Sequence, residues 1–121
     1  MREVFLVGIG GMVGSIARYG ISSLFSSYIT QFPFATFIVN VVGCLLIGIV
    51  FGLLERNVIG SDMRLLLATG VCGGFTTFST FSAETLFLLR DGFTITALLY
   101  VLLSIILCVV FTFVGLWITK P

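Results

Sequence analysis

The middle of the chain reads Gly73-Gly74-Phe75-Thr76-Thr77-Phe78-Ser79-Thr80-Phe81-Ser82. These ten residues contain two glycines, five hydroxyl side chains and three phenylalanines, without a charge. They lie inside an apolar segment, residues 63–89, that is long enough to cross a membrane. Glycines weaken a helix and crowded hydroxyls are unusual against lipid, so the stretch specifies more than a simple span. We predict that the helix is broken at Gly73-Gly74, at the middle of the membrane.

A helix broken at that depth has consequences for ions. Broken backbone is tolerated there only when it is buried in protein or lines a cavity. The half-helix before the break ends in free carbonyls that suit a cation, and the half after it begins with free amides that suit an anion. Beyond the break, Phe78, Phe81 and Ser82 fall on one side of the helix. Ring edges are weakly electropositive, so the pattern favours a path for a small anion over rings that only pack.

The composition predicts an all-α membrane protein. The 121 residues are 59% apolar and 9% charged, whereas soluble domains carry about 25% charged residues. That length holds four spans of about 20 residues with short loops. We expect a single four-helix transmembrane domain over residues 1–121, with spans at 4–28, 34–54, 63–89 and 94–119. Both termini then lie on one side, and the Lys/Arg balance only weakly favours the cytoplasm.

The residue inventory disfavours several function classes. The chain has no histidine and only five acidic residues, which are scattered, so we expect neither a transition-metal site nor a nucleophile-base pair and predict that it is not an enzyme. A net charge of +1 without a basic cluster argues against nucleic acid as a partner. The cysteines, all in apolar runs, are interpreted as reduced core residues: Cys44, Cys72 and Cys108.

Small residues predict where the helices approach each other. Glycines one turn apart let helix backbones come close in lipid, and they recur as Gly10-x-x-x-Gly14 and Gly48-x-x-x-Gly52. We interpret these four glycines as helix-packing residues. Arg18 follows the first pair, and it is either near the far interface, where its long side chain reaches water, or held by a partner.

Polar side chains in the second and fourth spans raise the same choice between packing and a pathway. Asn40 must face protein or water, because an unpaired amide in hydrocarbon is costly. It either fixes helix packing or lines a polar pathway. The fourth span carries polar groups on one helix face at intervals of four, and we favour a polar track over simple packing for them: Thr96, Tyr100, Ser104, Cys108 and Thr112.

The sequence resembles the small fluoride channel family, often called Fluc or CrcB. The stretch from Gly73 to Glu84 is similar to the most specific signature of that family. The run Gly-x-x-x-Arg-Tyr from Gly14 to Tyr19 and the position of Asn40 match as well. The resemblance therefore covers essentially the whole chain.

The resemblance implies a dual-topology, antiparallel homodimer in the lipid bilayer of the bacterial inner membrane, with two pathways for passive fluoride export and thus fluoride resistance. It also implies a structural sodium ion held by the backbone carbonyls of Gly73 and Thr76. Glu84 is expected near a vestibule. The residues expected along the fluoride pathway are an amide donor, two rings and four hydroxyls: Asn40, Phe78, Phe81, Ser79, Ser82, Tyr100 and Ser104.

Two alternatives belong to other functional classes. A small proton-coupled multidrug exporter has the same size and helix number, but its mechanism needs an acidic residue within the first span. Here Glu3 stands at the very start of that span, which counts against the exporter. A non-transporting membrane assembly subunit would explain the glycine packing, but not the polar line through the membrane.

Overall fold

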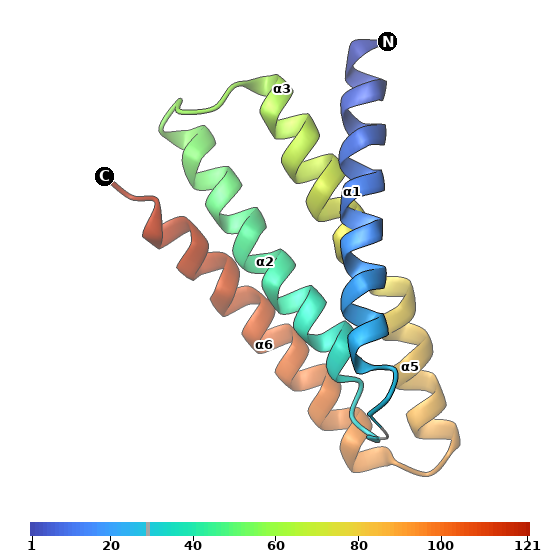
Figure 1. The fold of residues 1–121 in the computed structure, drawn as a ribbon. Coiled ribbons are helices and arrows are strands. Elements are labelled where there is room, and N and C mark those ends of the chain that lie inside the picture. Colours follow the sequence, from blue (N-terminus) through green and yellow to red (C-terminus); the bar gives the residue numbers. More distant parts are fainter. Residues whose placement is uncertain (29) are drawn as a thin grey trace.

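The computed structural model describes residues 1–28 and 30–121. Its helices, in chain order, are α1 (Arg2–Phe25), α2 (Phe34–Glu55), α3 (Ser61–Arg64), a π-helical segment (Leu65–Cys72), α4 (Gly73–Phe75), α5 (Phe78–Arg90) and α6 (Thr94–Ile118) (Figure 1). Within the described residues, four helical stretches are long and apolar enough to cross a membrane: α1, α2, Ser61–Arg90 and α6. The predictions of an all-α protein and of four spans are therefore confirmed.

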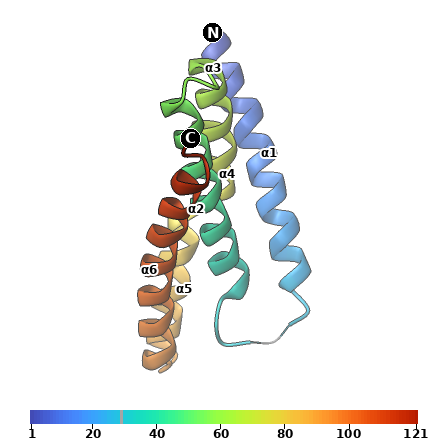
Figure 2. The ribbon, with the colours of Figure 1, turned by 90° about the vertical axis from the view of Figure 1, so that its left-hand side faces the viewer.

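The helices pack as two groups. Helix α2 lies along α6, and α1 lies along the π-helical segment and α4. In Figure 1 the green α2 and the red α6 run side by side, while α5 continues away from α4 toward the turn that leads into α6. Both chain ends lie toward the same end of the bundle (Figures 1 and 2), as an even number of spans requires.

Glycines make these two packed pairs possible. A Cβ added to Gly10 or Gly14 of α1 would collide with the backbone of the π-helical segment. A Cβ on Gly48 of α2 would collide with the backbone of α6, and a Cβ on Gly52 would collide with the side chain of Thr119, the residue after α6. The structure thus places three of these glycines where two helix backbones meet and the fourth against a side chain at the end of α6, which is the close approach that van der Waals packing in lipid favours.

The helix of the third span is interrupted at a different position from the one predicted. Gly73 and Gly74 are helical, and the extended residues are Thr76 (ψ 157°) and Thr77 (φ −149°). The prediction of a break at Gly73-Gly74 is therefore wrong in position. A Cβ on Gly74 would lie 3.0 Å from the Cα of Gly11, so close approach of α1, and not helix termination, requires glycine there.

The helix ends follow local chemistry. Helix α1 ends at Phe25, short of the expected residue 28, and the Ser26 N–H and Oγ both donate to the Ser23 carbonyl oxygen (3.3 and 2.7 Å). Gly92 has a φ of 88° in the tight turn between α5 and α6, a conformation that glycine adopts without a steric penalty. The π-helical segment was not predicted, because side-chain periodicity does not distinguish it from a weak α-helix.

Candidate functional site

The interruption at Thr76 and Thr77 is held by local hydrogen bonds. The N–H and the Oγ1 of Thr76 both donate to the Cys72 carbonyl oxygen, at 3.0 and 2.9 Å. The Thr77 Oγ1 accepts the N–H of Thr80 at 3.2 Å, which makes Thr77 the N-cap of α5. A threonine therefore caps each helix end at the interruption, and these hydrogen bonds fix the backbone conformation of Thr76 and Thr77.

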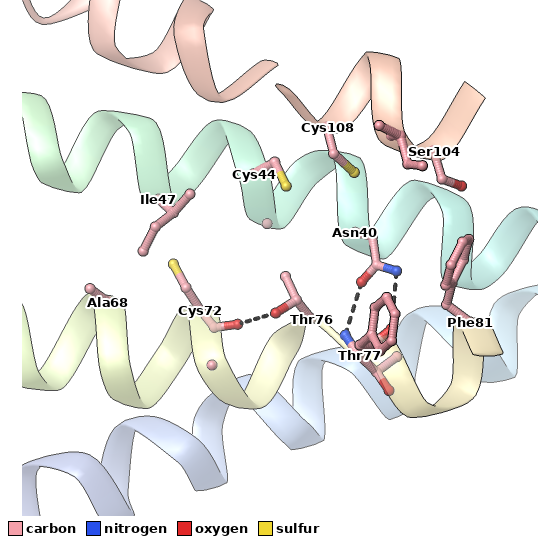
Figure 3. Close-up of a pocket in the computed structure, with 14 residues that line it drawn as sticks. Asn40, Cys44, Ile47, Ala68, Cys72, Thr76, Thr77, Phe81, Ser104 and Cys108 are labelled. Carbon is pink, nitrogen blue, oxygen red and sulfur yellow. Dashed lines mark hydrogen bonds between the residues drawn. The ribbon is translucent and has the colours of Figure 1, made fainter. Parts of the chain in front are cut away.

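Asn40 of α2 binds the same interruption from outside. Its Nδ2 donates to the Thr77 carbonyl oxygen at 3.1 Å, and its Oδ1 accepts the Thr77 N–H at 2.9 Å. Figure 3 shows both bonds reaching from α2 to the extended chain. The expected amide donor of the pathway thus uses its oxygen and one N–H on the backbone, which leaves one N–H for another acceptor.

A pocket of about 410 Å³ opens beside the interruption, between α2, α6 and the third span (Figure 3). Six of the residues expected at a functional site line it: Asn40, Gly73, Thr76, Phe78, Phe81 and Ser104. The three free cysteines also line it, from three different segments: Cys44, Cys72 and Cys108. The pocket therefore gathers the expected amide donor, the expected sodium ligands and the two expected rings around one space.

Ser104 is the most unusual polar group in this pocket. Its side chain is 6% exposed, and within the described residues its Oγ is the one buried side-chain oxygen or nitrogen without a hydrogen-bond partner. Ser104 and the Phe81 ring lie at the same end of the pocket (Figure 3). Because an unpaired buried hydroxyl costs about 1–3 kcal/mol, this position is suited to a ligand that accepts a hydrogen bond.

Three aromatic rings form a row at that end. The Phe81 ring centroid is 5.0 Å from that of Tyr100 and 5.6 Å from that of Phe78. Tyr100 is fully buried, whereas Phe78 is 77% exposed on this chain. The row therefore runs from the interior of the chain to its surface, with Phe81 in the middle.

Glu84 lies between three helices and is hydrogen-bonded at both carboxyl oxygens. Its Oε1 accepts from Thr36 Oγ1 of α2, and its Oε2 accepts from the Tyr100 hydroxyl of α6, each at 2.7 Å. The side chain is only partly exposed. The structure thus places the residue expected near a vestibule at a junction with Tyr100, and it adds Thr36, which the sequence reasoning did not single out as a site residue.

The remaining predicted polar residues do not converge on one place. Ser79 and Ser82 are exposed on the single chain, and the Ser79 Oγ lies 3.3 Å from the Thr77 Oγ1. On α6, the Thr112 hydroxyl donates to the Cys108 carbonyl oxygen of its own helix at 2.9 Å. The polar face of α6 is therefore divided, since Tyr100 binds Glu84, Ser104 faces the pocket and Thr112 bonds back to the helix.

A second pocket, of about 220 Å³, lies on another side of the interruption. Arg18 lines it, together with hydroxyl groups from α1, α2 and the third span: Ser15, Tyr19, Ser22, Thr36, Thr77 and Thr80. Thr77 lines both pockets. Sequence reasoning left Arg18 unassigned, although the spacing of Ser15, Arg18 and Ser22 indicates one shared helix face.

Two kinds of comparison relate the chain to known proteins. A family model described as CrcB-like protein, Camphor Resistance (CrcB), matches residues 5–116. A protein of Flavobacterium psychrophilum named fluoride-specific ion channel FluC is 43% identical over 122 residues, which cover 99% of this chain and 98% of that protein. Proteins of the same name from Phocaeicola vulgatus (41% identity; 99% and 100% covered) and Chlorobaculum tepidum (51% identity; 84% and 81% covered) are also similar.

Proposed function

The chain belongs to the CrcB-like family, which is a family of ion channels and not of enzymes, and we propose that it conducts fluoride passively. Its four spanning helices and its channel relatives make it a multi-pass membrane protein. The observation in the structure that carries the proposal is the Ser104 hydroxyl, which is buried, without a partner among the described residues, and at the same end of the pocket as the Phe81 ring. We place the protein in the bacterial inner membrane, where it would export fluoride and confer fluoride resistance.

The pocket chemistry fits a small anion that sheds water. Ser104 supplies an O–H donor, Asn40 has a second N–H, and the edges of Phe78 and Phe81 carry partial positive charge. None of these groups is a fixed cation that would trap the ion, and weak sites in sequence allow an ion to leave as well as enter. A hydrogen-bond acceptor as compact as fluoride can use such donors without filling the space that larger halides need.

The Arg18 pocket supplies the electrostatic part of the proposal. Arg18 is only partly exposed, and in the described part of the chain it forms no ion pair within 4.0 Å. A guanidinium in a concave site raises the local concentration of anions. Thr77 lines both this pocket and the pocket that Ser104 lines. An anion attracted by Arg18 would therefore be separated from the proposed pathway by Thr77.

We propose that two antiparallel copies form the functional channel. On one chain, Phe78 is 77% exposed and Gly73 is exposed beside the pocket, so the pathway lacks a wall that a second copy can provide. A two-fold axis in the membrane plane brings the two interruptions together. Single-cysteine variants labelled from each side of the membrane test this: labelling from both sides supports dual topology, and labelling from one side contradicts it.

The backbone at the interruption fits a sodium ion between the copies. Within the described residues no cluster of three or more His, Cys, Asp or Glu side chains is placed to hold a metal, and backbone carbonyl oxygens are ligands that Na⁺ accepts. In residues 1–28 and 30–121, no hydrogen bond reaches the Thr76 carbonyl oxygen. Unwound carbonyls of this kind suit Na⁺, and we propose Gly73 and Thr76 as ligands that fix the interruption and join the copies.

Flux measurements distinguish the channel from its alternatives. Purified protein in liposomes loaded with fluoride is predicted to release it, as recorded by a fluoride electrode, at the same rate with and without a proton gradient. Flux that requires the gradient would support a proton-coupled exporter, and no flux would support an assembly subunit. Empty liposomes and liposomes with heat-denatured protein serve as controls.

A further inference from the structure

The two hydrogen bonds between Asn40 and Thr77 have an effect on a third residue. In an α-helix the N–H of residue 77 bonds to the carbonyl of residue 73. Here the Thr77 N–H goes to the Asn40 Oδ1 at 2.9 Å, and α4 ends at Phe75. Asn40 therefore removes the donor that would otherwise occupy the Gly73 carbonyl.

The same side chain affects the neighbouring carbonyl. The Asn40 Nδ2 holds the Thr77 carbonyl at 3.1 Å, so both polar groups of Thr77 are fixed by one amide. Thr76 is thereby held between a helix end and a clamped residue, with a ψ of 157°, which turns its carbonyl out of the helical ladder. Gly73 and Thr76 are the two residues whose carbonyls we proposed as sodium ligands.

We propose that Asn40 is a positioning residue for the cation site. It captures the Thr77 N–H, and in doing so it leaves the Gly73 and Thr76 carbonyls available to sodium. The inference rests on the proposed function, and it differs from the role of anion donor that the family resemblance implies, because it concerns the backbone of the third span. An amide is suited to this task since it offers an acceptor and a donor side by side, as a neighbouring strand would.

Sodium content, and not flux alone, tests the inference. Protein is exchanged into a sodium-free N-methyl-D-glucamine buffer, and bound sodium is measured by atomic emission. Wild type is predicted to retain one ion for each pair of chains. Asn40→Leu, which has the same branching but no hydrogen-bonding atoms, frees the Thr77 N–H to bond the Gly73 carbonyl, and retention is predicted to fall by about tenfold or more, because a competing hydrogen bond forms in each copy.

Two further variants separate positioning from anion binding. Asn40→Asp keeps a carboxyl oxygen that accepts the Thr77 N–H, so it is predicted to retain sodium within about twofold of wild type while losing fluoride flux. Ser104→Ala, which alters the pathway away from this contact, is predicted to retain sodium fully. A fluoride donor with no positioning role would instead leave the sodium content of Asn40→Leu unchanged.

Each result supports or overturns the positioning role of Asn40. Sodium retained by Asn40→Leu at the level of wild type, or lost from Asn40→Asp, overturns the positioning role while the fluoride proposal stands. Absence of sodium from wild type overturns both the sodium site and this inference, again without touching fluoride flux. If Asn40→Leu does not fold, Asn40→Ala, which also removes the acceptor of the Thr77 N–H, is measured in its place with the same predicted loss of sodium.

Discussion

Tyr100 donates its hydroxyl hydrogen to Glu84 Oε2 at 2.7 Å while its ring lies beside Phe81. The other carboxyl oxygen accepts from Thr36, so one carboxylate joins α2, α5 and α6. Tyr100 is fully buried. Its hydrogen bond to Glu84 therefore fixes the inner end of the row of aromatic rings. The polar face of α6 thus serves structure at Tyr100 and, in our proposal, conduction one turn later at Ser104.

Tyr100→Phe is expected to weaken the fold through this junction. The change removes one buried hydrogen bond to a carboxyl group, worth about 1–3 kcal/mol, and keeps the ring contacts. Unfolding in detergent, followed by circular dichroism against denaturant, measures the difference. A Thr119→Val variant, which removes a hydroxyl bonded to the last turn of the preceding helix α6, is the matched control, and equal stability of Tyr100→Phe and wild type contradicts the junction.

Ser104→Ala is expected to separate conduction from stability. The hydroxyl has no partner among the described residues, so its removal leaves the free energy of unfolding unchanged or slightly higher. Fluoride flux is expected to fall by about tenfold or more, because a hydrogen bond to a charged ion contributes about 1.5–3 kcal/mol. Thr112→Val, two turns away with its hydroxyl bonded to the helix, is the control. A flux equal to wild type would remove Ser104 from the pathway.

Gly14→Ala and Gly8→Ala form a matched pair on α1. A Cβ at Gly14 collides with the Val71 carbonyl oxygen, whereas a Cβ at Gly8 has nothing within 4 Å. Gly14→Ala is expected to lower the free energy of unfolding by about 1–3 kcal/mol through overpacking, and Gly8→Ala is expected to raise it by up to about 1 kcal/mol through helix propensity. Thermal unfolding measures both, and similar midpoints for the two variants contradict the packing of α1 on the π-helical segment.

Arg18→Gln is expected to slow fluoride flux in a salt-dependent way. The guanidinium attracts anions to the smaller pocket, so at low ionic strength flux falls by about tenfold. At about 1 M salt, where the Debye length is near 3 Å, the difference from wild type shrinks. Arg90→Gln, which changes an exposed arginine at the C-terminal end of α5, controls for charge alone. The same loss at every salt concentration would assign Arg18 a structural role.

The spans could be predicted from sequence because length and hydropathy leave one fold class, but the position of the interruption could not. Gly73-Gly74 suggested helix termination, yet Gly74 is small because the backbone of Gly11 lies against it. The true position depends on Asn40, whose partner is 37 residues away in sequence. A local sequence pattern cannot predict a contact between residues so far apart in the chain.

The candidate site shows the same limit. Family resemblance named Asn40, Phe81 and Ser104, and the structure brings them to one pocket. The resemblance could not show that the Ser104 hydroxyl has no partner in the described chain, or that Glu84 is hydrogen-bonded at both carboxyl oxygens. Both facts arise from the packing of separate helices. The sequence alone does not assign Arg18, because a lone arginine near the end of a span also fits an interfacial residue whose side chain reaches water.

Anion selectivity distinguishes a passive fluoride channel most directly from every other assignment. Liposomes containing the purified protein, loaded with either fluoride or chloride, are compared side by side with ion-selective electrodes at matched concentration. Rapid fluoride release is expected, with no chloride release above that of protein-free liposomes. Chloride release at a rate similar to that of fluoride, or no release of either ion, would contradict the assignment as a fluoride channel.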